Sequence, residues 1–296
     1  MTSKAKLTLG PVLFNWPPEK WRDFYFRIAD EAAVDCVTLG EVVCSKRLPF
    51  FEPLMADVIE RLQGAGKEVV LSTLALIMSK REMDIVRDIT AMNGLLVEAN
   101  DVSTATLLAG RPHTIGPFIN IYNEGTLAFF AKKGATRVCL PVELSGKTLS
   151  VLSKNAGLEL EVLAFGRLPL AVSARCYHAR AHSLSKDNCQ YVCTDDPDGM
   201  DLDTLDGEAF LALNGTQTLS YSCNNLIEEL AEMQQMGINR FRLSPHDIDM
   251  VGLAGAFRDV LDGKSPGQEL EELAEGLIFS NGYYHDVEGG RRVAAE

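Results

Sequence analysis

Apolar runs alternate with amphipathic stretches along most of the chain. Eight short runs have the composition of buried strands, at residues 7–13, 36–40, 68–74, 95–99, 114–120, 137–143, 158–166 and 240–244. Segments with helical spacing of apolar residues lie between them, at 18–32, 53–67, 226–237 and 250–263. Short apolar strands separated by helices predict a parallel sheet that is buried on both faces. The eightfold count predicts a closed TIM-type (β/α)8-like barrel, regular or irregular, with a doubly wound open sheet as the alternative.

The alternation fails between about residues 174 and 236. This stretch contains three cysteines and the turn-rich sequence "TDDPDGMDLDTLDG". A long irregular excursion from a compact domain usually carries function or is disordered. We therefore expect one barrel domain over residues 1–296, with an irregular insert after the seventh strand over 174–236. The polar tail over 283–296 is expected to be mobile. No G-x-G-x-x-G follows the first strand, so a dinucleotide-binding fold has no support.

Polar residues occur at or near the carboxyl ends of the predicted strands. They are Glu41, Thr73, Glu98, Asn120, Glu143 and Ser244, with Asn15 and Asn123 just beyond two of the ends. The carboxyl ends of barrel strands meet at the face that carries the active site in such enzymes. Glu41, Asn120 and Glu143 are therefore candidate catalytic residues. The alternative is that these strand ends are polar only because they meet solvent.

The charge and the N-terminus exclude several classes of protein. The 296 residues include 28 Lys and Arg against 41 Asp and Glu, which gives a formal net charge of −13. Such a surface repels phosphate backbones, so we expect no nucleic-acid partner. The N-terminus lacks the apolar core of a signal peptide, and "VVLSTLALIM" is too short to span a bilayer. We expect a soluble cytoplasmic protein without a membrane span, in which the seven cysteines do not form disulfides.

Four of the cysteines are placed to meet in a barrel. Cys176, Cys189 and Cys193 lie in the insert, and Cys44 follows the second strand. The loops after strands two and seven open on the same face of a barrel, so four thiolates can enclose a metal centre. None of these cysteines forms a C-x₂-C pair of the kind usual in structural zinc sites. The uneven spacing suits a [4Fe–4S] cluster, and zinc remains the alternative.

The other cysteines and nearby polar residues have simpler interpretations. Cys36, Cys139 and Cys223 are interpreted as buried structural residues. His178 and His182 lie four residues apart and are a possible metal pair, but no H-E-x-x-H motif is present. We interpret both histidines as exposed residues beside the cysteine loop. No nucleophile elbow, P-loop or Ser/His/Asp order is visible, so usual hydrolase and kinase chemistry has no support.

Two cations adjoin the cysteines in sequence. Lys46 follows Cys44 by two residues, and Arg175 directly precedes Cys176. A cluster held by four thiolates is negatively charged, so either cation can offset that charge. The alternative is that both are ordinary surface cations.

Several segments together resemble one family. "LGPVLFNWP", "TLGEVVCSKR", "LSTLALI", "CLPVELS", "FGRLPLAVSARC", "LNGTQTLS" and "RLSP" are similar to peptidase family U32, the collagenase-like peptidases, over about residues 8–245. "Peptidase" is a label for this family rather than an activity of every member. The branch that the chain resembles binds a [4Fe–4S] cluster through four cysteines. The resemblance implies that the ligands here are Cys44, Cys176, Cys189 and Cys193.

The resemblance also implies a role in oxygen-independent ubiquinone biosynthesis. The expected partner is the paralogue UbiU, in a heterodimer that hydroxylates the aromatic ring of the ubiquinone precursor. UbiT is the expected lipid carrier, and prephenate the expected oxygen donor. Related members hydroxylate RNA bases, a substrate that the acidic charge of this chain disfavours. The alternative is a non-catalytic, cluster-stabilised scaffold that supports UbiU. Phe118 and Ile119 in "GPFINIYN" depart from the family pattern, so pocket contacts there are not carried over.

Overall fold

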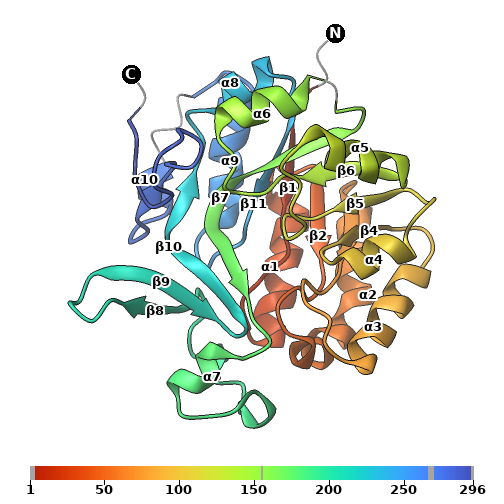
Figure 1. Cartoon of the computed structure of the whole chain (residues 1–296), viewed down its shortest axis with the longest axis vertical. Helices are drawn as coiled ribbons and strands as arrows, with labels where there is room; N and C mark the ends of the chain where they lie inside the picture. The colour runs from red at the N-terminus through yellow and green to blue at the C-terminus, as the bar shows by residue number, and fades with distance from the viewer. Residues whose placement is uncertain (1–3, 155, 266–269, 295–296) are drawn as a thin grey trace.

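The barrel is formed by eight parallel strands. The computed structural model describes residues 4–154, 156–265 and 270–294. The barrel strands are β1 (Lys6–Leu9), β2 (Cys36–Leu39), β3 (Glu68–Ser72), β4 (Leu96–Ala99), β5 (His113–Ile115), β6 (Ala135–Cys139), β7 (Glu159–Val172) and β11 (Arg240–Leu243). Each pairs in parallel with the next, and β11 pairs with both β7 and β1, which closes the sheet (Figure 1). The TIM-type barrel is confirmed, and the open-sheet alternative is wrong.

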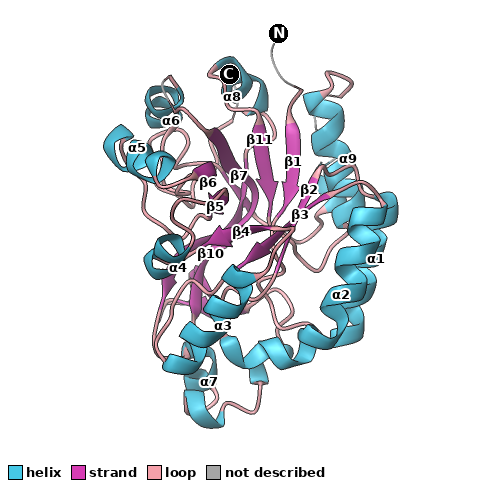
Figure 2. Cartoon of the chain, turned by 90° about the vertical axis from the view of Figure 1, so that its right-hand side faces the viewer, coloured by secondary structure: helices cyan, strands magenta, loops and turns pink. Residues whose placement is uncertain are grey.

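Helices surround the sheet (Figure 2). They are α1 (Pro18–Glu31), α2 (Leu48–Gly64), α3 (Lys80–Ala91), α4 (Val102–Leu107), α5 (Glu124–Lys132), α6 (Gly146–Ser153), α8 (Leu230–Gln235), α9 (Met250–Leu261) and the short α10 (Leu270–Leu273). In α1, Trp21, Tyr25 and Ile28 are buried at helical spacing, so one stripe of the helix faces the core. Among the described residues, no helix combines the length and the hydrophobicity that crossing a bilayer requires.

Several barrel strands end earlier than their apolar runs predict. β1 ends at Leu9 rather than at residue 13, and β5 ends at Ile115 rather than at residue 120. The apolar residues that follow, such as Val12, Phe14 and Ile119, are buried in the loops above the strands. Composition marks these residues as buried, but it does not distinguish a strand from a packed loop.

The insert is more regular than its sequence predicts. β7 continues beyond the barrel, and its outer part pairs antiparallel with β10 (Gln217–Asn225). β10 pairs with β9 (Ala209–Asn214), and β9 pairs with β8 (Met200–Asp203). These strands form an arm that projects from the barrel (Figure 1). The expectation of an irregular segment over 174–236 is therefore wrong for its second half. The edge strand β8 is exposed and rich in aspartate, so its composition resembles that of a loop.

The barrel interior contains a network of charged side chains. Arg242 on β11 donates to Glu161 Oε2 on β7 at 2.7 Å and also to Glu98 on β4. Because β4 and β11 are not neighbours in the sheet, the contact with Glu98 crosses the barrel. A second group forms around two further buried arginines, which pair with two glutamates: Arg137, Arg240, Glu68 and Glu159. The buried charges are thus paired, as burial requires.

The C-terminal segment contacts the barrel helices as far as it is described. The short strand β12 (Phe279–Ser280) pairs with β10. Asn281 Nδ2 donates to Glu229 Oε1 at 2.7 Å and to Val293 O at 2.9 Å. Tyr284 is buried, and its hydroxyl donates to Glu232 Oε2 at 2.7 Å. Residues 295–296 of the predicted tail lie outside the described residues.

Candidate metal centre

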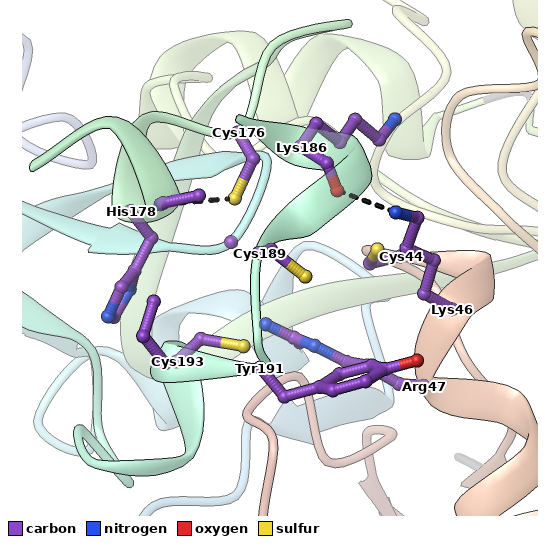
Figure 3. A pocket seen from close by; sticks show the side chains of 12 residues that line it. Cys44, Lys46, Arg47, Cys176, His178, Lys186, Cys189, Tyr191 and Cys193 are labelled. Atoms are coloured by element: carbon purple, nitrogen blue, oxygen red, sulfur yellow. Dashed lines mark hydrogen bonds between the residues drawn. The ribbon is translucent and has the colours of Figure 1, made fainter. Parts of the chain in front are cut away.

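The four cysteines singled out in the sequence surround one cavity. Cys44 lies in the loop after β2, just before the 3₁₀ turn η1 (Ser45–Arg47). Cys176, Cys189 and Cys193 lie in the first part of the insert, around α7 (Tyr177–Ala181), η2 (Lys186–Asn188) and η3 (Val192–Thr194). All four line one small cavity, with a volume of about 20 Å³. Figure 3 shows their sulfur atoms around this common space.

The cysteines enclose a space rather than converge on one point. Within the described ranges, no group of three or more His, Cys, Asp or Glu side chains is spaced to hold a metal ion. All seven cysteines are free thiols. The cavity thus lies between the loop after β2 and the insert after β7, which are more than a hundred residues apart in sequence. The barrel topology predicted that these two loops meet.

Glu41 fixes the loop that carries Cys44. Its side chain is buried, and Oε1 accepts hydrogen bonds from the N–H groups of Val43 at 2.7 Å and Cys44 at 2.8 Å. Burial raises the pKa of the Glu41 carboxyl, and the Arg47 charge together with the two N–H groups offsets part of that rise. Glu41 therefore positions the backbone of Cys44, which makes it a positioning residue rather than a group that faces a substrate.

The insert loop is shaped by two residues in left-handed conformation and is tied to the β2 loop. Gln190 and Tyr191 have φ angles of 50° and 56°, which reverse the chain between Cys189 and Cys193. Lys46 Nζ donates to the backbone carbonyl of Lys186 at 2.6 Å. The Lys46 side chain thus holds the two cysteine-bearing segments together.

Arg47 is the charged residue that the sequence reasoning missed. It is only 1% exposed, although it follows the first cysteine by three residues in "CSKR". Its guanidinium donates to Leu13 O at 2.8 Å and to Asn214 Oδ1 at 2.9 Å, and its charge lies near the Cys193 side chain. Arg47 lines the cavity beside the sulfurs (Figure 3), whereas Arg175 is exposed and does not line it.

Two of the thiols are held in the protonated form by their surroundings. Burial raises the pKa of Cys44, and the nearby Arg47 charge offsets part of the rise. Burial also raises the pKa of Cys176, whose Sγ accepts a hydrogen bond from the N–H of Ala179 at 3.4 Å. Metal ligation requires thiolates, so binding of a metal centre here must release protons.

The histidine pair supports the insert, and His178 is also among the residues that line the cysteine cavity. His178 is buried, so the expectation that it is exposed is wrong, whereas His182 is exposed. His178 Nδ1 lies 3.2 Å from Leu213 O, and its Nε2 lies 2.9 Å from Asp196 Oδ2. Burial is the main cause that lowers the pKa of His178. Figure 3 shows its ring turned away from the cysteines, because α7 packs on β9.

The three candidate catalytic residues do not meet. Glu41 is buried under the Cys44 loop, whereas Asn120 is exposed and lines a separate groove that neither glutamate lines. Glu143 is exposed and accepts a hydrogen bond from the Tyr122 hydroxyl. All three residues lie at the same end of the barrel because each follows a strand. They nevertheless do not form a common site.

The remaining polar strand-end residues have structural partners. Thr73 Oγ1 donates to Glu98 O at 2.9 Å, and the Glu98 carboxylate belongs to the charged network in the barrel. Ser244 is buried against Gly166.

Asn15 Nδ2 donates to Thr194 Oγ1 at 2.6 Å, which joins the loop after β1 to the cysteine-bearing segment.

The other three cysteines are buried, as predicted. Burial raises the pKa of Cys36 to about 12.

Cys223 has a more unusual setting, because its Sγ lies 3.8 Å from His246 Nε2 and His246 Nδ1 lies 3.2 Å from Asp198. A thiol, an imidazole and a carboxylate in series resemble the groups of a cysteine protease. Cys223 is 1% exposed and His246 Nε2 already accepts the N–H of Arg167, so this group is closed to a substrate.

Comparison with protein families gives one match that covers most of the chain. The model for peptidase family U32 matches residues 24–290. The matched range includes the barrel from the middle of α1 onward, all four cavity-lining cysteines and the arm.

Proposed function

The chain belongs to peptidase family U32, and from this premise we propose that its cysteine cavity holds a [4Fe–4S] cluster. The observation that carries the proposal is the meeting of Cys44 with the three insert cysteines around one cavity. We further propose that the chain is a UbiV-type subunit in the cytoplasm. In that role it pairs with UbiU in oxygen-independent hydroxylation of the ubiquinone precursor, with UbiT as lipid carrier and prephenate as oxygen donor.

The shape of the site favours a cluster over zinc. In a structural zinc site, four ligand sulfurs lie about 2.3 Å from a single ion. A [4Fe–4S] cluster instead binds its thiolates at the corners of a larger body, so that the ligands stand around a space. The four sulfurs here stand around a common space (Figure 3), and among the described residues no three ligand side chains converge on one point, which suits the second arrangement.

The polar residues around the cavity suit an anionic group. A bound cluster supplies one-electron transfer, and charges close to it tune its potential. Arg47 is buried beside the sulfurs and compensates the charge of the thiolates. Glu41 orients the Cys44 loop, and Lys46 holds that loop to the insert. Each of these residues acts on the ligands rather than on a substrate.

One observation favours the alternative of a non-catalytic scaffold. Glu41, Asn120 and Glu143 do not form a common site. We therefore propose to change the two exposed candidates singly, as Asn120→Ala and Glu143→Gln, and to measure anaerobic quinone production. Loss of production with intact iron content and intact UbiU binding supports a catalytic role. Unchanged production in both variants supports the scaffold.

The cluster itself is tested by purification without oxygen. We expect equal amounts of iron and acid-labile sulfide, with the absorption and EPR spectra of a [4Fe–4S] centre. Cys193→Ala should lower the iron content and loosen the insert, because metal-binding energy is partly folding energy. Cys36→Ala is the matched control, since Cys36 is a buried cysteine inside β2 and away from the cavity. Stoichiometric zinc without sulfide, or unchanged iron in Cys193→Ala, contradicts the proposal.

A further inference from the structure

A second concave feature lies at the carboxyl end of the barrel, apart from the cysteine cavity. It is an open groove of about 680 Å³ formed by the loops after β3, β4 and β5 and by one side of α5. This volume is in the range of about 300–1,000 Å³ that is typical of small-molecule sites. Its apolar wall consists of Ala75, Val102, Phe118, Ile119, Phe129 and Phe130.

Two of the apolar groups in the groove are strongly exposed. Val102 is 61% exposed and Phe129 is 53% exposed. Covering apolar surface stabilises a complex by about 25 cal/mol per Å². An aromatic ring in the groove can pack against Phe129 and Phe118, and aromatic pairs contribute about 0.5–1.5 kcal/mol beyond area burial. The wall of the groove therefore favours a flat apolar group.

The polar part of the groove consists of amides and one carboxylate. Asn100 is 1% exposed, and its Nδ2 donates to Ser72 Oγ at 2.8 Å and Thr73 O at 2.9 Å. Its Oδ1 has no hydrogen-bond partner in the described chain. Asp101 is the charged residue of the groove, and no lysine or arginine is among the described residues that line it. Amide groups can bind a neutral polar substituent, whereas Asp101 repels an anion.

The groove and Cys44 share an apolar cluster. Ala75 and Phe118, which line the groove, and Cys44 all pack against the small buried cluster of Leu13, Val42 and Val43. The N–H of Ala75 donates to Val42 O at 2.9 Å, which fixes the loop after β3 against the Cys44 loop. A ligand in the groove would thus contact residues that pack on the same apolar cluster as Cys44.

We propose that this groove binds an uncharged small molecule with an aromatic ring that carries a hydrogen-bonding substituent. The ring lies against Phe118 and Phe129, and the substituent meets the asparagine amides of the groove. Electron exchange between this molecule and a centre at Cys44 would depend on the proposed function. The binding of the molecule in the groove does not depend on it.

The probe is 4-butylphenol, titrated into the full chain with and without its metal and followed by calorimetry and saturation-transfer NMR. The comparison ligand is 4-butylbenzoate, which has a similar shape and a negative charge. We expect the phenol to bind, and the benzoate to bind at least about tenfold more weakly because of Asp101. Phe129→Ala should raise the Kd for the phenol about fivefold.

Phe210→Ala is the matched control. Phe210 lies on β9 of the arm, outside the groove, and is 57% exposed, close to the value for Phe129. It should leave the Kd unchanged, and the circular dichroism of both variants should match that of the unaltered chain. Equal effects of the two variants, equal affinity for phenol and benzoate, or no binding at millimolar phenol overturns the proposal. If the chain binds the phenol but contains no iron and sulfide, only the cluster proposal is refuted. If the chain contains the cluster but does not bind the phenol, only the groove proposal is refuted.

Discussion

Arg47 connects three separate parts of the chain through one buried guanidinium. From the turn η1, it donates to Leu13 in the loop after β1 and to Asn214 at the end of β9, and its charge lies near Cys193. Gly215 makes room for it, because a Cβ at this position would lie 2.7 Å from the guanidinium. The φ angle of Gly215 is +61°, a conformation that also favours glycine.

The substitution Arg47→Leu is therefore expected to affect both stability and the metal centre. It removes two hydrogen bonds from a charged donor, so the free energy of unfolding should fall by about 3 kcal/mol, measured by urea unfolding of the metal-free chain. Loss of the positive charge should also lower the reduction potential of a bound cluster, because the reduced cluster carries more negative charge. The potential is measured by EPR-monitored titration.

Arg175→Leu is the control, since Arg175 adjoins Cys176 in sequence but is exposed. We expect a change in unfolding free energy of less than about 0.5 kcal/mol and no shift in potential. A larger effect of Arg175→Leu than of Arg47→Leu would show that the charge beside the cluster comes from Arg175.

At the scale of residues, sequence spacing identified which cysteines meet but not what surrounds them. The barrel topology brings the loops after β2 and β7 together, so Cys44 could be paired with the insert cysteines in advance. Arg47 was missed because Lys46 and Arg175 lie closer to a cysteine in sequence, and only folding buries Arg47. His178 resembled a surface residue because its burial depends on the packing of α7 on β9, which local sequence does not encode.

The strands β7 and β11 direct charged residues into the barrel at a period of two. Glu159 and Glu161 alternate on β7, and Arg240 and Arg242 alternate on β11. Burial alone would raise the pKa of Glu161, but the charges of Arg242, Arg137 and Arg240 lower it further than burial raises it. The net effect is a pKa below the usual glutamate value.

Stability should therefore fall at acidic pH. A carboxylate whose pKa is lower in the folded than in the unfolded chain stabilises the fold above the unfolded pKa, about 4.3 for glutamate. That contribution is lost as the pH falls through the lower, folded pKa. The free energy of unfolding of the metal-free chain, measured by urea at decreasing pH, should decline below about pH 4.3. A constant value down to pH 3 would contradict the pKa direction for Glu161.

Arg242→Met should change both the size and the sign of this dependence. It leaves Glu98 and Glu161 without their shared partner, which should cost about 3–5 kcal/mol at neutral pH. Protonation then relieves a buried unpaired charge, so this part of the cost should shrink as the pH falls. Arg27→Met is the control, because Arg27 forms only exposed ion pairs with Glu31 and Asp249 and should cost less than about 1 kcal/mol.

At the scale of elements, hydrophobic periodicity located all eight barrel strands and left their ends uncertain. The runs "LELEVLAFG" and "RFRLS" read as strands despite their charges, because apolar and charged residues alternate. The same pattern does not reveal whether the charged face points into the barrel or to solvent. Strand β8 was missed because Asp201 and Asp203 lie on an exposed edge, where the composition is that of a turn.

The two ends of the whole molecule have different roles. The cysteine cavity and the groove lie at the carboxyl ends of the barrel strands, together with the arm. The described C-terminal segment contacts α6 and α8 at the opposite end from α7 (Figure 1). Between them lies the paired charged network of the barrel interior. Stability of the C-terminal end is therefore expected to be separable from binding of the proposed cluster at the other end.

Substitution of Tyr284 tests this separation. Tyr284→Phe removes only the hydrogen bond to Glu232, so the free energy of unfolding should fall by about 1 kcal/mol. Tyr284→Ala also removes a buried ring that packs against Gly146, and it should cost about 3–5 kcal/mol. Iron content per chain should be the same in both variants as in the unaltered protein. If the C-terminal segment were mobile, as its polar sequence indicates, neither variant would change the unfolding curve. If it helped to form the metal centre, Tyr284→Ala would lose iron before it lost helical structure.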